Sequence, residues 1–152
     1  MKENLEIKPL IGFGDLKFGA SKKEVESFFG SPQEVETLDM EGEDGQVEVW
    51  SYWDQGHSVY FEKELKDICS NFETDNESSI LFGKEVFSLS KEEVMELMKE
   101  QGFAEVEEEK EDEELIIFFP DAHMQFVFEK DDLVLVSWAV AMDDKEKVLW
   151  PE

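Results

Sequence analysis

The sequence predicts an α+β fold, a single domain over residues 1–152 made of two tandem copies of a helix followed by an antiparallel meander. Two echoes indicate the duplication. The segment 18–25 (FGASKKEV) returns 69 positions later as FSLSKEEV, and the segment 54–63 (DQGHSVYFEK) returns 67 positions later as DAHMQFVFEK. Because the echoes keep their order and nearly their spacing, repeat one covers about 13–73, repeat two about 82–141, and an acidic tail the residues 142–152.

Each copy is expected to begin with a helix. The segments 21–24 (SKKE) and 90–93 (SKEE) are capping boxes, in which the serine hydroxyl and the glutamate side chain satisfy backbone N–H groups at the helix start. Gly30 and Gly102 are the expected stops. Each helix carries one apolar stripe at helical spacing, formed by Val25, Phe28 and Phe29 in the first and by Val94, Leu97 and Met98 in the second.

After each helix the apolar period changes to two, which is typical of antiparallel strands. We predict strands near 46–53, 57–64 and 66–73 in repeat one, and near 114–119, 123–130 and 133–141 in repeat two, with the helices packed on one face of the sheet. The opening segment 5–13 is either an extra strand or a short helix, and Gly12-Phe13-Gly14 indicates flexibility before the first helix. The charges of 105–114 repel one another, which predicts a solvated hairpin tip.

The net charge of the chain limits the classes of partner that it can bind. The chain of 152 residues has a formal net charge of −26, and all 14 basic residues are lysine. Nucleic acid is therefore an unsuitable partner, since phosphate binding uses clustered cations, and an anionic membrane would repel the chain. A basic protein is the partner that such a field attracts. The alternative that acidity serves only solubility stays open at this point.

We expect a cytoplasmic location, because the first residues lack the apolar core of a signal peptide and no later stretch approaches a membrane span. Cys69 is the only cysteine, which excludes an intrachain disulfide and suits a reducing compartment. We interpret it as a small, half-buried strand residue.

Candidate chemical sites are few. The acidic segment 39–44 could suggest calcium, but it lacks the spacing of the EF-hand loop, so a solvated turn is favoured. His57 and His123 could be metal ligands or acid–base groups, although their equivalent places in the two repeats explain them without chemistry. No catalytic motif occurs. We therefore expect no enzyme, no catalytic residue, no cofactor and no metal.

The remaining candidate is one face of the sheet. Alternation assigns one apolar set to the helix side: Val47, Val49, Val59, Phe61, Phe126 and Phe128. The opposite side then holds further apolar residues, with Ile116 and Val127 among them. There we predict a protein-binding patch of aromatic anchors and acidic partners: Glu48, Trp50, Tyr52, Tyr60, Glu62, Phe118, Glu129 and Trp138. The competing interpretation is that the N-terminal segment, the tail or a second copy buries this side.

One family shares the pattern of the first repeat, in which Gly19 and Ser21 lead into Glu24-Val25 and the helix ends in Phe29-Gly30-Ser31-Pro32 before a meander. It resembles the repeat of the beta-lactamase inhibitor protein-like superfamily, which also includes small outer-membrane assembly lipoproteins. The second repeat departs from the pattern, with Ser88 in the place of Gly19 and Gln101-Gly102-Phe103 in the place of the stop.

The resemblance implies a concave, aromatic sheet face that grips a partner protein, and no enzymatic activity. Members of the family carry disulfides or a lipid-attachment cysteine, and Cys69 provides neither, so target and compartment are not implied.

Together these observations suggest a bacterial immunity or inhibitor protein that neutralises a basic partner, such as a nuclease toxin domain. The alternatives are an enzyme with a carboxylate pair in the acidic loops, or a self-associating structural or ligand-carrier protein. The sequence leaves the oligomeric state open.

Overall fold

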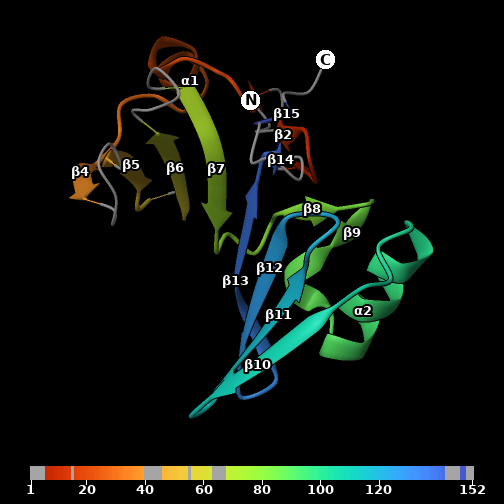
Figure 1. The fold of residues 1–152 in the computed structure, drawn as a ribbon. Helices are drawn as coiled ribbons and strands as arrows, with labels where there is room; N and C mark the ends of the chain where they lie inside the picture. The colour runs from red at the N-terminus through yellow and green to blue at the C-terminus, as the bar shows by residue number, and fades with distance from the viewer. Residues whose placement is uncertain are drawn as a thin grey trace.

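The computed structural model describes residues 6–14, 16–39, 46–54, 56–62, 68–142 and 148–149, and the structural statements below concern these residues. The fold is α+β, with two α-helices and large antiparallel sheet (Figure 1). The helices are α1 (Lys22–Phe29) and α2 (Lys91–Glu100), and a short 3₁₀ helix (Val86–Ser88) precedes α2. None of the described helices combines the length and hydrophobicity that crossing a bilayer requires.

Eight of the described strands form the main sheet. In chain order they are β4 (Glu34–Asp39), β5 (Gln46–Tyr52), β6 (His57–Glu62), β7 (Ile68–Thr74), β10 (Glu107–Glu111), β11 (Glu114–Phe119), β12 (Met124–Glu129) and β13 (Asp132–Ala139). Across the sheet the order is β10-β11-β12-β13-β7-β6-β5-β4, and all neighbours are antiparallel. Strands β7 and β13 therefore meet in the middle, with β4 and β10 at the edges (Figure 1).

All six strands expected from the sequence are present, and a further strand, β4 or β10, precedes each group of three. The prediction of a solvated hairpin tip over 105–114 is correct in that residues 107–114 form an exposed hairpin. Its extent is wrong, because β10 pairs with β11 along its whole length and only Asp112 and Glu113 form the turn. Every residue of β10 is exposed, so its sequence has no apolar alternation that would predict a strand. Its backbone bonds to β11 decide its conformation, and its charges discourage further strands from adding to this edge.

Both helices start at the serines that the capping boxes indicate. The Ser21 hydroxyl accepts a hydrogen bond from the Glu24 backbone N–H (3.2 Å), and the Glu24 carboxylate accepts one from the Ser21 N–H. Ser90 and Glu93 repeat this exchange, with distances of 3.2 and 2.9 Å. The predicted stripes are buried at Val25, Phe29, Val94, Leu97 and Met98, while Phe28 is partly buried.

A second sheet holds the N-terminal segment against the first. Its strands, β1 (Glu6–Lys8), β2 (Gly12–Phe13), β3 (Leu16–Lys17), β8 (Ile80–Leu81) and β9 (Lys84–Glu85), lie in the order β3-β2-β1-β8-β9. Of the two possibilities for the opening segment, the strand is therefore correct where the structure describes it. A separate antiparallel pair joins β14 (Ala141–Met142) to β15 (Val148–Leu149).

Strand β2 is packed tightly on the main sheet. The Phe13 ring lies 5.1 Å from that of Trp138 and 5.8 Å from that of Phe72, and the Trp138 indole N–H donates to the Gly12 carbonyl (2.9 Å). A Cβ on Gly12 would lie 1.9 Å from the Leu16 backbone oxygen. Gly12 thus permits a close approach of two backbones, which replaces our interpretation of this segment as flexible.

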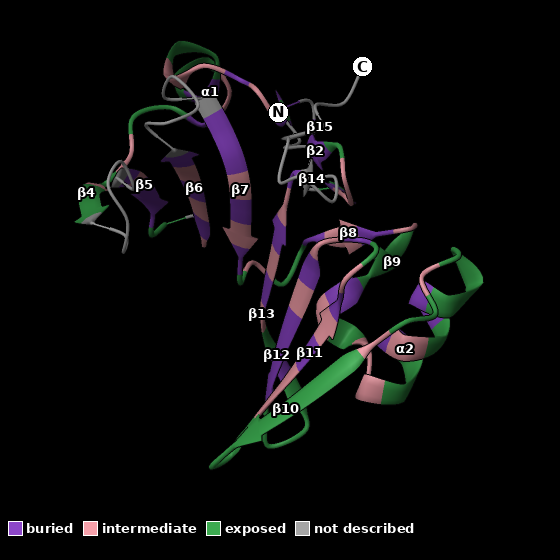
Figure 2. Cartoon of the chain, in the orientation of Figure 1, coloured by how far each residue is buried: buried purple, intermediate pink, exposed green. Residues whose placement is uncertain are grey.

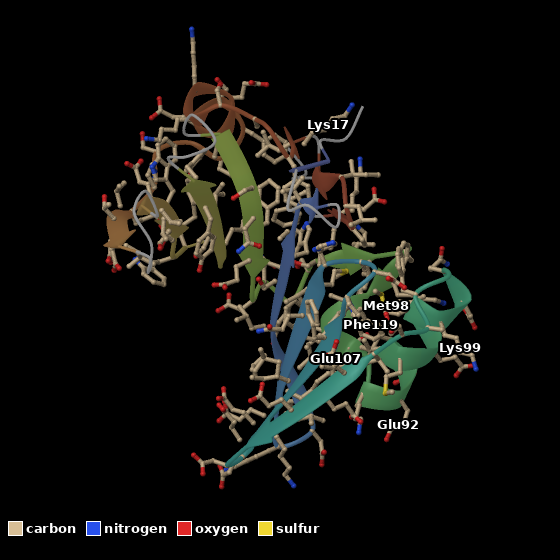
Figure 3. All side chains as sticks on the ribbon, viewed as in Figure 1. Lys17, Glu92, Met98, Lys99, Glu107 and Phe119 are labelled. Atoms are coloured by element: carbon tan, nitrogen blue, oxygen red, sulfur yellow. The ribbon has the colours of Figure 1, made fainter. Side chains whose placement is uncertain are left out.

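The helices and the second sheet lie on the same side of the main sheet, which we call the helix face. Its buried side chains are Trp50, Tyr52, Val59, Phe61, Phe72, Val136, Trp138, Met124, Phe126, Phe128, Ile117 and Phe119. Figure 2 shows this burial along the central strands, in contrast to the exposed β10. Met98 and Phe119 lie between α2 and the sheet, whereas Glu92 and Lys99 lie on the outer surface of α2 (Figure 3).

Candidate protein-binding face

The side of the main sheet that faces away from the helices is defined by strand pairing, because residues directly opposite on neighbouring strands point to the same side. Val49 pairs with Tyr60 in one half, and Ile116 pairs with Val127 in the other. We call this side the open face. Its main apolar residues are Val49, Tyr60, Ile116, Phe118, Val127 and Leu135, and its main acidic residues are Glu73, Glu107, Glu109, Glu111, Glu114 and Glu129.

The predicted orientation of β5 is wrong. Trp50 pairs with Val59, and Val49 pairs with Tyr60, so Trp50 and Tyr52 point to the helix face and the two valines of β5 point away from it. Trp50 packs on Phe61 with 4.9 Å between ring centroids. Both alternating sets of β5 are apolar, so alternation alone could not assign their sides. Contacts with α1 decide them: the Tyr52 hydroxyl donates to the Gly30 carbonyl (3.0 Å).

Trp138 is also misplaced by the prediction, since it is only 1% exposed. It pairs with Phe72 on one side and with Met124 on the other, which puts all three side chains on the helix face. The N-terminal strand β2 covers it, as the competing interpretation of the aromatic face proposed. Trp50, Tyr52 and Trp138 are therefore core residues and are not available as anchors for a partner.

The three predicted acidic partners have different positions. Glu48 pairs with Phe61 on the helix face, where its carboxylate accepts a hydrogen bond from the Trp50 indole N–H (2.6 Å) and lies 3.1 Å from the Lys22 ammonium. Glu62 ends β6, and its side chain is outside the described part of the structure. Glu129 is exposed and pairs with Glu114 on the open face.

Of the predicted site residues, Tyr60, Phe118 and Glu129 thus share the open face, and the structure adds acidic residues that sequence reasoning missed. Glu107 pairs with Phe118, and Glu109 pairs with Ile116. No residue pattern indicated these neighbours, because they depend on β10 being a strand. Lys110 is the only described lysine in the main sheet, and its pairing with Leu115 puts it on the helix face.

An open groove crosses the β10–β12 part of this face. It has a volume of about 490 Å³ and is lined by Glu107, Glu108, Glu109, Ile116, Phe118 and Gln125. Ile116 and Phe118 are half-buried, while Glu107 and Glu109 are exposed. The groove therefore combines an apolar floor with an acidic wall, an arrangement suited to a ligand that is both apolar and cationic.

The middle of the open face is polar. The Tyr60 hydroxyl donates a hydrogen bond to Oε2 of Glu73 (3.2 Å). Burial raises the pKa of Tyr60 to about 12, helped by the negative charge of Glu73. Burial likewise raises the pKa of the Glu73 carboxyl above its ordinary value, and the charge of Asp75 adds to this, while the bond from Tyr60 opposes it. The neighbouring Asn71 Oδ1 is buried without a hydrogen-bond partner.

The two histidines do not form a common site on the open face. His57 is buried on the helix face, with its Nδ1 2.8 Å from the Thr74 hydroxyl and its ring 4.9 Å from that of Phe13. Burial lowers its pKa to about 4, so the ring is neutral at pH 7. His123 is half-buried in the turn before β12.

Cys69 is fully buried on the helix face, which raises the pKa of its thiol far above the usual range and disfavours a nucleophilic role.

Carboxylates are numerous, but those of the described residues do not single out a catalytic pair. Glu34 and Glu36 share a hydrogen bond that raises the pKa of Glu36. Both lie on the edge strand β4, and neither lines the groove described above. Within the described residues, no group of three or more histidine, cysteine, aspartate or glutamate side chains could hold a metal ion. Residues 40–44 of the acidic segment considered for calcium lie outside the described part.

Comparisons of this chain with protein-family models, with curated proteins and with solved structures found no match. Function is therefore inferred from the surface chemistry of the open face.

Proposed function

We propose that this chain is a protein-binding inhibitor, most specifically a bacterial immunity protein, which neutralises a basic partner protein through the open face. The observation that carries the proposal is the composition of that face: half-buried Ile116 and Phe118 next to exposed Glu107 and Glu109, with no described lysine among its strand residues. Aromatic and aliphatic side chains supply anchors in protein interfaces, and surrounding charges supply specificity and steering.

Charge complementarity favours a basic protein over a second copy of this chain. The formal net charge is −26, and two open faces brought together would place rows of glutamates against each other. A basic toxin domain such as a nuclease has the opposite charge, because it binds phosphate. The aromatic and acidic face would cover its substrate site. This proposal implies the cytoplasm, where such a toxin would act on the cell's own nucleic acid.

The order of elements supports a duplicated origin for this face. Helix α1 is followed by the four strands β4 to β7, and α2 is followed by β10 to β13. We propose that the two halves are tandem copies of one unit, related to the repeat of the beta-lactamase inhibitor protein-like superfamily. The antiparallel pairing of β7 with β13 would then join the two copies into one binding surface.

The test uses the products of the genes that flank this one as probes. One of them, expressed alone, should arrest growth, and coexpression of this chain should restore it. Calorimetry with the purified pair should then show that Glu107→Lys together with Glu109→Lys weakens binding by about 10- to 100-fold, since two charged contacts are lost.

The matched control is Glu96→Lys together with Glu100→Lys, two exposed glutamates on α2, which changes the net charge equally. It should alter the association rate alone. Equal loss of affinity in both double variants would overturn the assignment to the open face. Flanking products that neither harm growth nor bind this chain would overturn the proposed immunity function.

A further inference from the structure

The groove between β10 and β12 has a more specific chemistry than the rest of the open face. Two rows of paired residues cross it: Glu107 is opposite Phe118, which is opposite Gln125, and Glu109 is opposite Ile116. All five residues line the same open space of about 490 Å³. A side chain entering there meets apolar surface below, carboxylates on the β10 side and an amide on the β12 side.

This combination fits a long cationic side chain. Its methylene stem can cover the half-buried Ile116 and Phe118 while its charged end reaches Glu107 and Glu109. Both glutamates are on one side of β10, because they are two residues apart in the strand. They can therefore approach one cation from the same direction.

The lysines nearest to the groove in the described part of the chain do not fill it. Lys110, between Glu109 and Glu111, is turned to the helix face by its register with Leu115. Lys91 lies 2.6 Å from Glu108, which pairs with the core residue Ile117. In the described part of the chain, neither Glu107 nor Glu109 forms an ion pair with a lysine. Since none of the described lysines supplies it, we look for the cation that complements this wall on another molecule.

Arginine suits the groove better than lysine does. The guanidinium group is a planar fork with five N–H donors, which can bind a carboxylate through two parallel bonds and still donate to the carbonyl of Gln125. Its flat face can also stack on the ring of Phe118. The lysine ammonium has three donors around a compact point charge, so it cannot use both the ring and the amide in this way.

We propose that this groove is an arginine-binding subsite, which receives one exposed arginine side chain of the basic partner. The proposal rests on the proposed function, since it names the partner group that the open face recognises. It assigns the selectivity for arginine to Phe118 and Gln125, and the charge recognition to Glu107 and Glu109. The subsite lies beside β10, the strand that the sequence pattern does not predict.

The probe for this subsite is the blocked tripeptide acetyl-Gly-Arg-Gly-amide, titrated at low ionic strength and followed by NMR. Its matched controls are the same peptide with lysine and with citrulline, which keeps the shape of arginine but has no charge. The arginine peptide should shift the Ile116 methyl and Gln125 side-chain amide signals. The lysine peptide should bind several-fold more weakly at these signals, and the citrulline peptide should leave them unchanged.

Two variants locate the binding. Glu107→Gln together with Glu109→Gln should lower the affinity for the arginine peptide by about 10-fold or more, because charge-assisted hydrogen bonds are lost. Glu96→Gln together with Glu100→Gln on α2 removes the same charge and should leave the shifts as they are. Shifts that are equal for arginine and lysine, or that persist in the groove variant, would overturn the subsite.

The partner protein separates this inference from the proposed function. Replacing its surface arginines by lysine, one at a time, should reveal one position at which affinity for this chain falls. If the partner binds the open face but no such replacement matters, the subsite is wrong and the inhibitor function stands. If the arginine peptide occupies the groove but neither flanking gene product binds, the proposed function is wrong and the subsite stands.

Discussion

The Tyr60 hydroxyl donates a hydrogen bond to the Glu73 carboxylate, 3.2 Å away on the adjacent strand, in the middle of the open face. The bond stabilises a half-buried negative charge at a place where burial and Asp75 both disfavour it. Tyr60 therefore helps to keep this part of the face anionic, in addition to supplying apolar surface.

Removal of the phenolic hydroxyl should raise the pKa of Glu73. In Tyr60→Phe the carboxylate loses the donor that stabilises it, so its pKa should rise further above the ordinary value. NMR titration of the side-chain carboxyl carbon measures this directly. Tyr52→Phe removes a hydroxyl that donates to Gly30 on the other side of the sheet, and it should leave Glu73 unchanged. A fall in the Glu73 pKa in Tyr60→Phe would contradict this role.

Buried His57 should make the protein less stable as the pH falls. Its pKa is about 4 in the folded chain and about 6.5 in the unfolded chain, so between these values only the unfolded state takes up the proton. Neutral His57 therefore makes its full contribution to the free energy of unfolding above pH 6.5, and this contribution is lost as the pH falls toward 4. The loss amounts to about 3 kcal/mol.

Urea unfolding at a series of pH values tests this contribution. Other groups titrate too, and relief of the net negative charge acts in the opposite direction. The measured quantity is therefore the difference between the wild type and His57→Gln, which should shrink as the pH falls from 7 to 4. The half-buried turn residue His123, changed to Gln, is the control. A difference that does not depend on pH would show that His57 takes up its proton as readily in the folded chain as in the unfolded chain, which would contradict the lowered pKa.

Trp138 should be a major stabilising residue rather than a binding residue. It is 1% exposed, packs on Phe13 and Phe72, and donates to the Gly12 carbonyl. Trp138→Ala should lower the free energy of unfolding by about 3–5 kcal/mol. Trp53→Ala is the matched control, because Trp53 is 63% exposed, and it should change the free energy by less than about 0.5 kcal/mol. Similar losses in both variants would contradict the assignment of Trp138 to the core.

Strand β10 should be fastened to α2 by the ion pair between Lys91 and Glu108, whose Nζ and Oε1 lie 2.6 Å apart. The pair is partly exposed, so Lys91→Gln should lower the free energy of unfolding by only about 0.5 kcal/mol. It should also speed hydrogen exchange of the β10 amides about two-fold. Lys130→Gln is the control, since Lys130 meets Glu113 only at 3.8 Å in the exposed hairpin end. Unchanged exchange in Lys91→Gln would mean that pairing with β11 alone holds the strand.

Local signals predicted most of the secondary structure. Both helices begin at the serines of the capping boxes, because a capping box is a set of bonds among four consecutive residues. Six strands followed from period-two alternation. Strand β10, with the sequence EEEKE, could not be predicted in this way, because its conformation depends on pairing with β11 and not on an apolar face of its own.

The binding face could be predicted only in part. Tyr60, Phe118 and Glu129 are on the open face, but Trp50, Tyr52 and Trp138 are in the core. Alternation divides a strand into two sides without saying which side is covered. For strands such as β5, where both sides are apolar, that choice depends on contacts with distant segments.

The sequence by itself determined the helix starts, six strands, the strong acidity and the absence of arginine, because these depend on residue type and local spacing. Only the tertiary structure decided which aromatic residues remain available to a partner. The hydrogen bond between Trp138 and Gly12 joins residues 126 positions apart, and it holds β2 on the helix face, where β2 covers the aromatic side chains. The side that stays open carries apolar residues, Tyr60 and Phe118 among them, beside an acidic edge strand. Its chemistry arises from pairing across strands rather than from any motif along the chain.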